Sequence, residues 1–100
     1  RIDIAADGLE VLDRMRSSLY DLVILDIEMP KMSGIETAQC IRNGLVGEKN
    51  SRIPIIAMTA HVLDDVLDEC RKAGMDHVIS KPLSIIELGG MIGDVMDERQ

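Results

Sequence analysis

The chain has 100 residues, of which 46% are hydrophobic, and this length predicts one compact domain spanning residues 1–100. Its formal net charge of −7 at pH 7 argues against a domain that binds nucleic acid or anionic lipid through its own surface. No apolar stretch approaches the ~20 residues that a transmembrane helix needs, so we expect no contact with the membrane core.

Strand signals alternate with helix signals four times along the chain, which is the pattern of βα units around a parallel sheet. Residues 2–4 alternate between apolar and polar, as in an edge strand. Residues 22–25 are apolar throughout, which predicts a strand at the centre of the sheet. Two further apolar runs, at residues 55–58 and 78–79, predict the remaining strands.

The predicted helices have start signals, and three share the spacing of a capping box. These are Asp7-x-x-Glu10, Ser33-x-x-Glu36 and Ser84-x-x-Glu87. Apolar residues then recur with helical period and predict three faces that pack on the sheet. They are Val11, Leu12, Met15 and Leu19 in the first helix, Ile35, Ala38 and Ile41 in the second, and Val62, Val66, Leu67, Cys70 and Ala73 in the third.

The connections between these elements are polar or rich in glycine. Gly44 and Gly74 suit helix C-terminal caps, and residues 47–52 predict a solvated surface loop. Cys40 and Cys70 lack the spacing of a metal or redox motif, so we expect reduced thiols in a cytoplasmic protein. A last helix over residues 85–96 is predicted from its apolar period, although glycines interrupt it.

Three of the predicted strands end in polar residues. Asp26 follows the second strand, Thr59 follows the third, and Lys81 lies just after the fourth. Because the carboxyl ends of parallel strands meet at one edge of a sheet, a carboxylate, a hydroxyl and an ammonium are expected there together. Asp26 alone could merely cap the following turn, but an unpaired carboxylate at a buried strand end is costly, which favours a functional role.

These three groups suit phosphoryl chemistry. A carboxylate can accept a phosphoryl group as an acyl phosphate, but its negative charge opposes the incoming phosphate, so cations must neutralise the pair. Lys81 supplies one cation, and Mg²⁺ is the divalent ion that best suits carboxylate and phosphate oxygens. The Thr59 hydroxyl can donate a hydrogen bond to a phosphoryl oxygen.

Three motifs together resemble a response regulator receiver domain: Asp21 to Gly34, Ile53 to Ala60, and Lys81-Pro82. The resemblance covers essentially the whole chain, and the motif sequences are most similar to those of receivers of hybrid sensor histidine kinases. It implies a flavodoxin-like α/β fold with a doubly wound parallel sheet. It also implies that Asp26 is the phosphoacceptor and that Lys81 is the cation that contacts the phosphate.

The resemblance assigns further roles around this acceptor. The main-chain carbonyl of Glu28 would ligate Mg²⁺ together with Asp26, and the contact between Thr59 and the phosphate would switch the loop that follows. The side chains of Glu28 and His61 would flank the phosphorylated site and tune the lifetime of the acyl phosphate. The bond before Pro82 would be cis and would aim the preceding lysine across the sheet edge.

The sequence departs from the family in one respect. Receivers begin with a central strand, whose end carries an acidic pair that holds the metal, and a helix follows it. Neither has a counterpart here, so the fold is expected to be incomplete at its N-terminus, with βα repeated four times instead of five. We therefore expect residues 1–100 to be a fragment of a longer chain, and an incomplete sheet of this kind predicts a strand-swapped or associated oligomer.

The expected function is therefore a receiver of a two-component phosphorelay, which takes a phosphoryl group from a histidine kinase or a histidine phosphotransfer domain. Such a domain changes its partner binding on phosphorylation and turns over no external substrate. A first alternative is a pseudo-receiver, an interaction module of the same fold that is not phosphorylated. A second is a hydrolase of the haloacid dehalogenase type, which fits poorly because that class has a second aspartate where this chain has Glu28.

Overall fold

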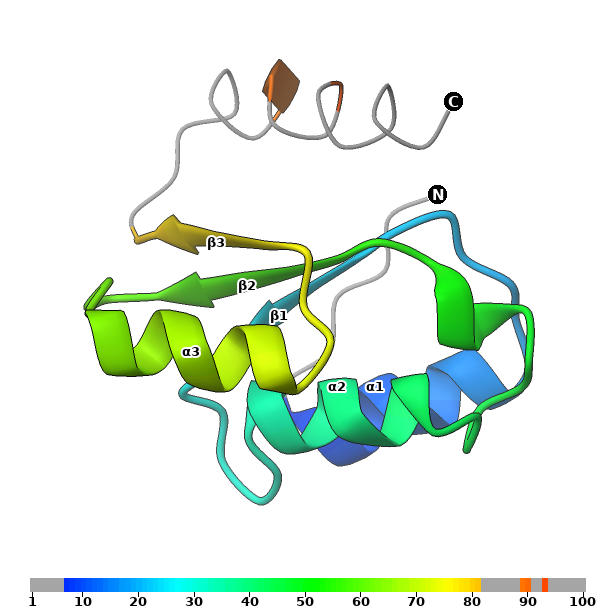
Figure 1. The fold of residues 1–100 in the computed structure, drawn as a ribbon. Coiled ribbons are helices and arrows are strands. Elements are labelled where there is room, and N and C mark those ends of the chain that lie inside the picture. Colours follow the sequence, from blue (N-terminus) through cyan, green and yellow to red (C-terminus); the bar gives the residue numbers. More distant parts are fainter. Residues whose placement is uncertain (1–6, 82–88, 91–92, 94–100) are drawn as a thin grey trace.

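The computed structural model describes residues 7–81, 89–90 and 93. Its elements, in chain order, are α1 (Gly8–Arg16), β1 (Val23–Asp26), α2 (Gly34–Arg42), the 3₁₀ helix η1 (Asn50–Arg52), β2 (Ile55–Thr59), α3 (Asp64–Lys72) and β3 (His77–Ser80). The three strands form a parallel sheet in the order β1-β2-β3, and α1, α2 and α3 lie along one face of it (Figure 1). The predicted strand at residues 2–4 and the bond before Pro82 lie outside the described residues. Most of the predicted helix at 85–96 lies outside them too, and its described residues, 89–90 and 93, are helical.

The register of the sheet aligns the three strands at their carboxyl ends. Asp26 pairs with Met58, and Thr59 pairs with Ser80. Two main-chain bonds extend this register past the strands, from Ile27 N to the Met58 carbonyl at 3.0 Å and from Lys81 N to the Thr59 carbonyl at 2.9 Å. In the described part of the sheet β2 lies between β1 and β3, and it is also the most deeply buried of these strands. The central place predicted for residues 22–25 stays a prediction, because it depends on residues 2–4, which are not described.

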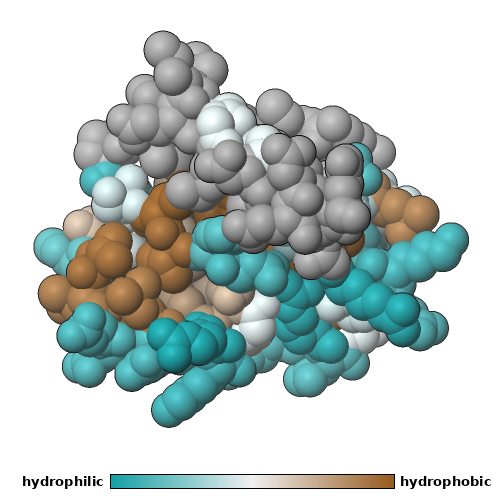
Figure 2. Space-filling model, turned by 45° about the horizontal axis from the view of Figure 1, so that its top comes forward, coloured by the Kyte–Doolittle hydropathy of each residue, from teal (hydrophilic) through white to brown (hydrophobic). Residues whose placement is uncertain are grey.

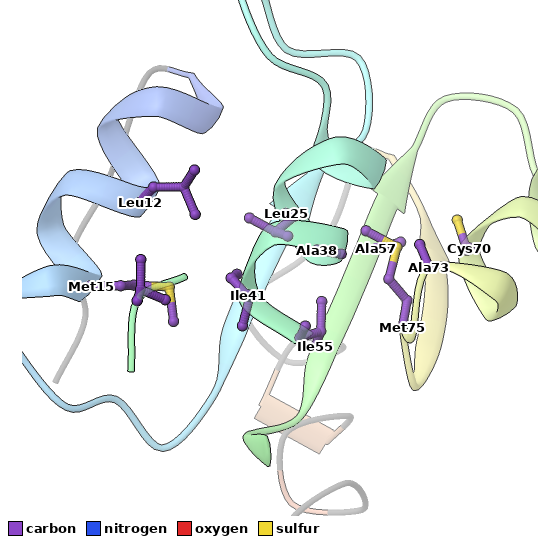
Figure 3. Packing of buried hydrophobic residues seen from close by; sticks show 11 residues of the cluster. Leu12, Met15, Leu25, Ala38, Ile41, Ile55, Ala57, Cys70, Ala73 and Met75 are labelled. Carbon is purple, nitrogen blue, oxygen red and sulfur yellow. The ribbon is translucent and has the colours of Figure 1, made fainter. Parts of the chain in front are cut away.

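The main core lies between the helices and the lower face of the sheet as drawn in Figure 1. Figure 3 shows the helical side chains pointing toward those of the strands. The labelled members of this core are Leu12, Met15, Leu25, Ala38, Ile41, Ile55, Ala57, Cys70, Ala73 and Met75. Full burial of a Leu or Ile side chain contributes about 1.5–3 kcal/mol, so this mainly aliphatic cluster, against which Tyr20 packs, holds the helices on the sheet.

The opposite face of the sheet carries a smaller apolar cluster. Ile56 and Ile79 are buried there, and Leu22, Ile24 and Met58 pack against them and are partly exposed. Figure 2 shows most of the visible hydrophobic side chains gathered on one side of the molecule, with hydrophilic side chains along the edge below them. In the described part of the chain, none of the helices has the length and hydrophobicity that crossing a lipid bilayer requires.

Two of the three predicted helix-start caps are confirmed, and the third, Ser84-x-x-Glu87, lies outside the described residues. The Asp7 carboxylate accepts a 2.9 Å bond from Glu10 N at the start of α1. Ser33 and Glu36 form a reciprocal capping box at the start of α2, with each side chain accepting from the other residue's main-chain N–H. Gly44 and Gly74 follow the ends of α2 and α3 with φ of +85° and +90°, the left-handed conformation that favours glycine at this position.

Two predicted core residues lie at the surface instead. Leu19 was placed on the apolar stripe of the first helix, but α1 ends at Arg16 and the Leu19 side chain is 64% exposed. Val62 was placed on the stripe of the third helix, but it precedes α3 and is exposed. In both cases apolar residues at helical spacing continue beyond one end of the helix. The apolar pattern alone therefore does not show where the helix begins or ends.

The predicted solvated loop at residues 47–52 is wrong at one position. Asn50 begins η1 and is 1% exposed. Its side-chain amide N–H groups donate to the carbonyls of Met15 and Ser18 at 2.9 Å and of Val46 at 3.3 Å, and its oxygen accepts from Tyr20 N. Asn50 therefore joins the end of α1 to the loop after α2, and its full set of partners offsets the cost of burying an amide.

A second polar side chain joins segments at the amino ends of the strands. The Arg42 guanidinium, at the end of α2, donates to the carbonyls of Gly74 at 2.8 Å, Ser51 at 2.9 Å and Ile53 at 2.7 Å. It also pairs with Asp76 at 3.0 Å, and the same Asp76 oxygen accepts from Ile55 N at 2.8 Å. Arg42 thus fixes the start of β2 and the loop before β3 relative to α2.

Candidate functional site

The predicted site residues converge at the carboxyl ends of the strands. Asp26 ends β1, Thr59 ends β2, and Lys81 follows the last residue of β3. The parallel register places these ends at one edge of the sheet, as the sequence predicts. Lys81 Nζ lies 2.6 Å from Asp26 Oδ2, and both side chains are 30% exposed, so the pair is open to a ligand on one side.

The environment of Asp26 favours its ionised form. Burial raises the pKa of this carboxyl, but the hydrogen bond and positive charge of Lys81, together with the Glu28 N–H bond, outweigh that effect and bring the pKa below its ordinary value. The hydrogen bond and the charge of Asp26 in turn raise the pKa of Lys81. At neutral pH the edge therefore presents an ionised carboxylate that is already paired with a cation.

Thr59 contributes a buried hydroxyl to this edge. It is 2% exposed, and its Oγ1 lies 3.2 Å from Glu28 Oε1 and 3.3 Å from the His61 carbonyl, with either oxygen able to accept its single proton. The same Oγ1 accepts a 3.2 Å bond from His61 N. The Thr59 hydroxyl therefore links the end of β2 to the loop after β1, through Glu28, and to the loop that leads to α3, through His61.

Glu28 occupies a more central position than the predicted flanking one. Its Oε1 accepts from Thr59 Oγ1 and from Ala60 N, each at 3.2 Å, and its Oε2 lies 3.5 Å from Lys81 Nζ. Its own N–H donates to Asp26 Oδ1 at 2.9 Å. The Ala60 N–H is a site group that sequence analysis missed. Its position directly after Thr59, at the strand end, was the available signal.

Two further residues define the rim of the site. His61 is exposed, and the contacts described for it are made by its main chain, so its predicted tuning role stays a prediction. Gly34, the first residue of α2, is buried against β1. A Cβ at Gly34 would lie 2.6 Å from the Asp26 carbonyl oxygen and 2.9 Å from Ile27 Cα, so only glycine lets α2 begin this close to the end of β1.

The metal prediction can be compared with the donors present. The Asp26 carboxylate and the Glu28 main-chain carbonyl are hard oxygen donors, the type that Mg²⁺ prefers. Within residues 7–81, 89–90 and 93, no group of three or more His, Cys, Asp or Glu side chains is arranged to hold a metal ion. The donor chemistry fits Mg²⁺, which commonly keeps waters and substrate oxygens as its remaining ligands.

The chain is similar to known signalling proteins. The family model of the response regulator receiver domain matches residues 1–92. The aerobic respiration control sensor protein ArcB of Escherichia coli K12 is 38% identical over 96 residues, which cover 96% of this chain and 12% of that protein. The hybrid signal transduction histidine kinase I of Dictyostelium discoideum is 36% identical over 88 residues, which cover 83% of this chain and 5% of that protein. The chain thus spans only a small part of these relatives.

Solved structures show the same likeness. The receiver domain of the sensor histidine kinase PA1611 from Pseudomonas aeruginosa PAO1, which has a magnesium ion coordinated in its active-site cleft, superposes with a TM-score of 0.83 at 29% identity. The match covers 97% of this chain and 77% of that one. The chemotaxis protein CheY4 of Vibrio cholerae also gives a TM-score of 0.83, at 26% identity over 91% of this chain and 73% of that one. These matches confirm the flavodoxin-like α/β fold, and the chain belongs to the response regulator receiver domain family, with relatives among the hybrid histidine kinases.

Proposed function

We propose that Asp26 is the phosphoacceptor of a two-component phosphorelay and that its donor is a phosphohistidine. In this step the bond between phosphorus and the histidine nitrogen breaks, and a bond between phosphorus and an Asp26 oxygen forms. The leaving nitrogen keeps the electron pair of the broken bond. The observation that carries the proposal is the 2.6 Å contact between Lys81 Nζ and Asp26 Oδ2, which places a cation beside an ionised nucleophile at an open edge of the sheet.

The other groups of the site support the same chemistry. Lys81 offsets the negative charge that the acceptor and the phosphoryl group bring together, and the Thr59 hydroxyl and the Ala60 N–H can donate to phosphoryl oxygens. Preorganised donors of this kind stabilise charge without reorganisation during the reaction. Glu28 and His61 would flank the acyl phosphate and affect its lifetime.

We further propose that Asp26 and the main-chain carbonyl of Glu28 hold Mg²⁺. When bound, the ion would supply positive charge that offsets the negative phosphoryl oxygens. Two observations support this: the oxygen donors of the site are of the right type, and the similar receiver from Pseudomonas aeruginosa contains magnesium in its cleft.

The relatives indicate the kind of partner. Sensor proteins and histidine kinases are among the proteins that match, so we propose a histidine kinase or a histidine phosphotransfer domain as the phosphoryl donor. Residues 1–100 would act as one receiver domain within this exchange. The domain would be modified once for each signal and would not turn over an external substrate.

Phosphorylation would change the segment from Thr59 to α3. The Thr59 hydroxyl is shared between Glu28 and the His61 carbonyl, so a phosphoryl oxygen that recruits it would disturb both contacts. Asp64 and Asp65, at the start of α3, are exposed, and the N-cap residue Leu63 makes no side-chain capping bond. A helix start without a side-chain cap is suited to shift between two states, and the exposed surface around it would be read by a partner.

Acetyl phosphate tests the proposal. The full protein is incubated with acetyl phosphate and Mg²⁺, and intact mass spectrometry followed by peptide mapping should find one phosphoryl group on Asp26. Asp26→Asn should remove this adduct, whereas Asp21→Asn, which changes an exposed acid just before β1, should retain it. A wild-type protein that forms no adduct, or an Asp26→Asn protein that still forms it, would contradict the proposal.

The second candidate is the pseudo-receiver. One observation favours it, because the described residues contain no group of three acidic, His or Cys side chains arranged for a metal. A pseudo-receiver would bind its partner equally well before and after treatment with acetyl phosphate and Mg²⁺, and it would show no adduct. Turnover of a generic phosphomonoester would instead support the hydrolase alternative.

A further inference from the structure

The donors that would bind a phosphoryl group are already in contact with Glu28. The Thr59 hydroxyl and the Ala60 N–H each lie 3.2 Å from Glu28 Oε1, and Lys81 Nζ lies 3.5 Å from Oε2. These contacts come from β2, from the loop after it and from the end of β3. One carboxylate therefore gathers all three donors that the proposed function requires.

A carboxylate and a phosphoryl group compete for such donors. Both are oxyanions that accept charge-assisted hydrogen bonds from hydroxyl, amide and ammonium groups. The Ala60 N–H and the Thr59 O–H have one proton each, so an oxygen of Glu28 and an oxygen of phosphate compete for it. The negative charge of Glu28 would also oppose a second anion in the same space.

We propose that the Glu28 carboxylate is a built-in occupant of the anion-binding position formed by Thr59, Ala60 and Lys81, and that a phosphoryl group enters only after this side chain leaves. The inference rests on the proposed function. It assigns Glu28 a positioning role before loading, which is distinct from any effect on the lifetime of the acyl phosphate. The closed form has the carboxylate on its donors, and the open form has it in solvent.

The geometry allows the side chain to leave. Glu28 lies in the loop after β1, and its side chain is 44% exposed. Its contacts through Oε1 and Oε2 are long, whereas the 2.9 Å bond from its N–H to Asp26 Oδ1 belongs to the main chain. Rotation of the side chain therefore opens the position without moving the backbone that orients Asp26.

Occupancy of this kind lowers the apparent affinity for a ligand. The apparent Kd equals the intrinsic Kd divided by the fraction of molecules in the open form, so a protein that is open in about one molecule in ten binds the ligand about tenfold more weakly. Removing the Glu28 carboxylate removes this loss of affinity. We expect Glu28→Ala to form the Asp26 adduct from acetyl phosphate roughly three- to tenfold faster than wild type.

Three substitutions separate occupancy from simple charge repulsion. Glu28→Asp keeps the charge but is one methylene shorter, so its carboxylate cannot reach Thr59 and Ala60, and it should behave like Glu28→Ala. Glu28→Gln keeps a side-chain oxygen that can accept both bonds but loses the attraction to Lys81, so it should lie between wild type and Glu28→Ala. Glu48→Gln removes one charge from an exposed acid that pairs with Arg52, and it serves as the control.

The test has two measurements on the full protein, after thermal melts confirm that each variant is folded. Amide hydrogen exchange at Ala60, followed by NMR without any ligand, reports the hydrogen bond to Glu28. We expect exchange to accelerate about tenfold in Glu28→Ala and Glu28→Asp, and to stay at the wild-type rate in Glu48→Gln. The initial rate of adduct formation from acetyl phosphate with Mg²⁺ is then measured for the same proteins.

Each outcome decides the inference. Faster exchange at Ala60 together with faster adduct formation in both Glu28→Ala and Glu28→Asp supports it. Unchanged Ala60 exchange in these two variants overturns it. Faster adduct formation in Glu28→Ala and Glu28→Gln, with Glu28→Asp at the wild-type rate, also overturns it, because the charge of Glu28 alone would then explain the effect. If Ala60 exchange accelerates but no protein forms an adduct, Glu28 occupancy stands and the proposed phosphoacceptor role fails.

Discussion

Lys81 and Asp26 form their ion pair across an intervening strand. Asp26 ends β1 and Lys81 follows β3, and β2 lies between these two strands in the sheet. The lysine side chain therefore reaches over the end of β2, where Thr59 lies, to place Nζ 2.6 Å from Oδ2. Residues that are more than fifty positions apart in the chain thus form one charged pair because the sheet is parallel.

The first prediction concerns Lys81. Lys81→Gln should slow adduct formation on Asp26 by about 10²–10³-fold, the usual cost of losing one preorganised charge-stabilising group. Initial rates from acetyl phosphate, measured by intact mass, test this. Lys72→Gln, which removes an exposed lysine at the end of α3, should react at the wild-type rate. Equal rates for wild type and Lys81→Gln would show that the lysine has no part in loading.

The second prediction concerns Arg42. Arg42→Ala should lower the free energy of unfolding by about 2–4 kcal/mol, because three carbonyls and Asp76 lose their charged donor together. Arg42→Lys should not restore the loss, since an ammonium cannot reproduce the fork of donors. Urea unfolding measures both variants.

The matched control is Arg71→Ala. Arg71 is exposed and lies 3.7 Å from Asp68, so its loss should change stability by less than about 0.5 kcal/mol. A similar change for the Arg42 and Arg71 variants would refute the claim that Arg42 joins the segments at the amino ends of the strands.

The third prediction concerns Asn50. Asn50→Ala should destabilise the fold by about 2–3 kcal/mol, because the carbonyls of Met15 and Ser18 and the N–H of Tyr20 lose a buried partner. Asn43→Ala, at the exposed end of α2, should cost less than about 0.5 kcal/mol. Chemical unfolding measures the free energy of unfolding of both proteins. A comparable decrease in the two variants would mean that the loop at residues 47–52 is only a surface connection.

The fourth prediction uses the two thiols. Burial, with a smaller effect of the Glu69 charge, raises the pKa of Cys70 above its ordinary value of 9.0. The raised pKa means that the folded state favours the neutral thiol, so its contribution to stability is present below pH 9.0 and is lost as the pH rises through the folded value. Iodoacetamide at pH 8 should therefore modify partly exposed Cys40 well before buried Cys70.

Peptide mapping over time measures this order. Added urea should bring the Cys70 rate up to that of Cys40, because unfolding exposes the thiol. Rapid alkylation of Cys70 in the folded protein would show that α3 does not hold this side chain in the core as the structure has it.

Several features could be predicted from the sequence because their physical causes are local. Asp7 and Ser33 cap helices through bonds to residues three positions on, and such bonds depend only on short spacings. Gly44 and Gly74 mark helix ends because few other residues adopt positive φ readily. The placement of Asp26, Thr59 and Lys81 at one edge followed from a general property of parallel sheets, which requires only that the strands be recognised.

Other features were inaccessible because they depend on distances between segments that are remote in sequence. The central position of Glu28 needs the loop after β1 and the ends of β2 and β3 in one place, and no spacing within the chain encodes it. Burial of Asn50 requires the end of α1 to meet the loop after α2. Leu19 was misplaced for the converse reason, since its apolar period continues after the helix has ended.

The sequence by itself therefore determined the order and type of most described elements, the helix caps and the three strand-end groups. Only the tertiary structure decided which of the polar side chains meet, that Glu28 lies on the donors of the site, and that Arg42 and Asn50 join separate segments. The physical reason is range: capping bonds and apolar periodicity act over a few residues, whereas a hydrogen bond between Glu28 and Thr59 exists only after the sheet has brought two strand ends together.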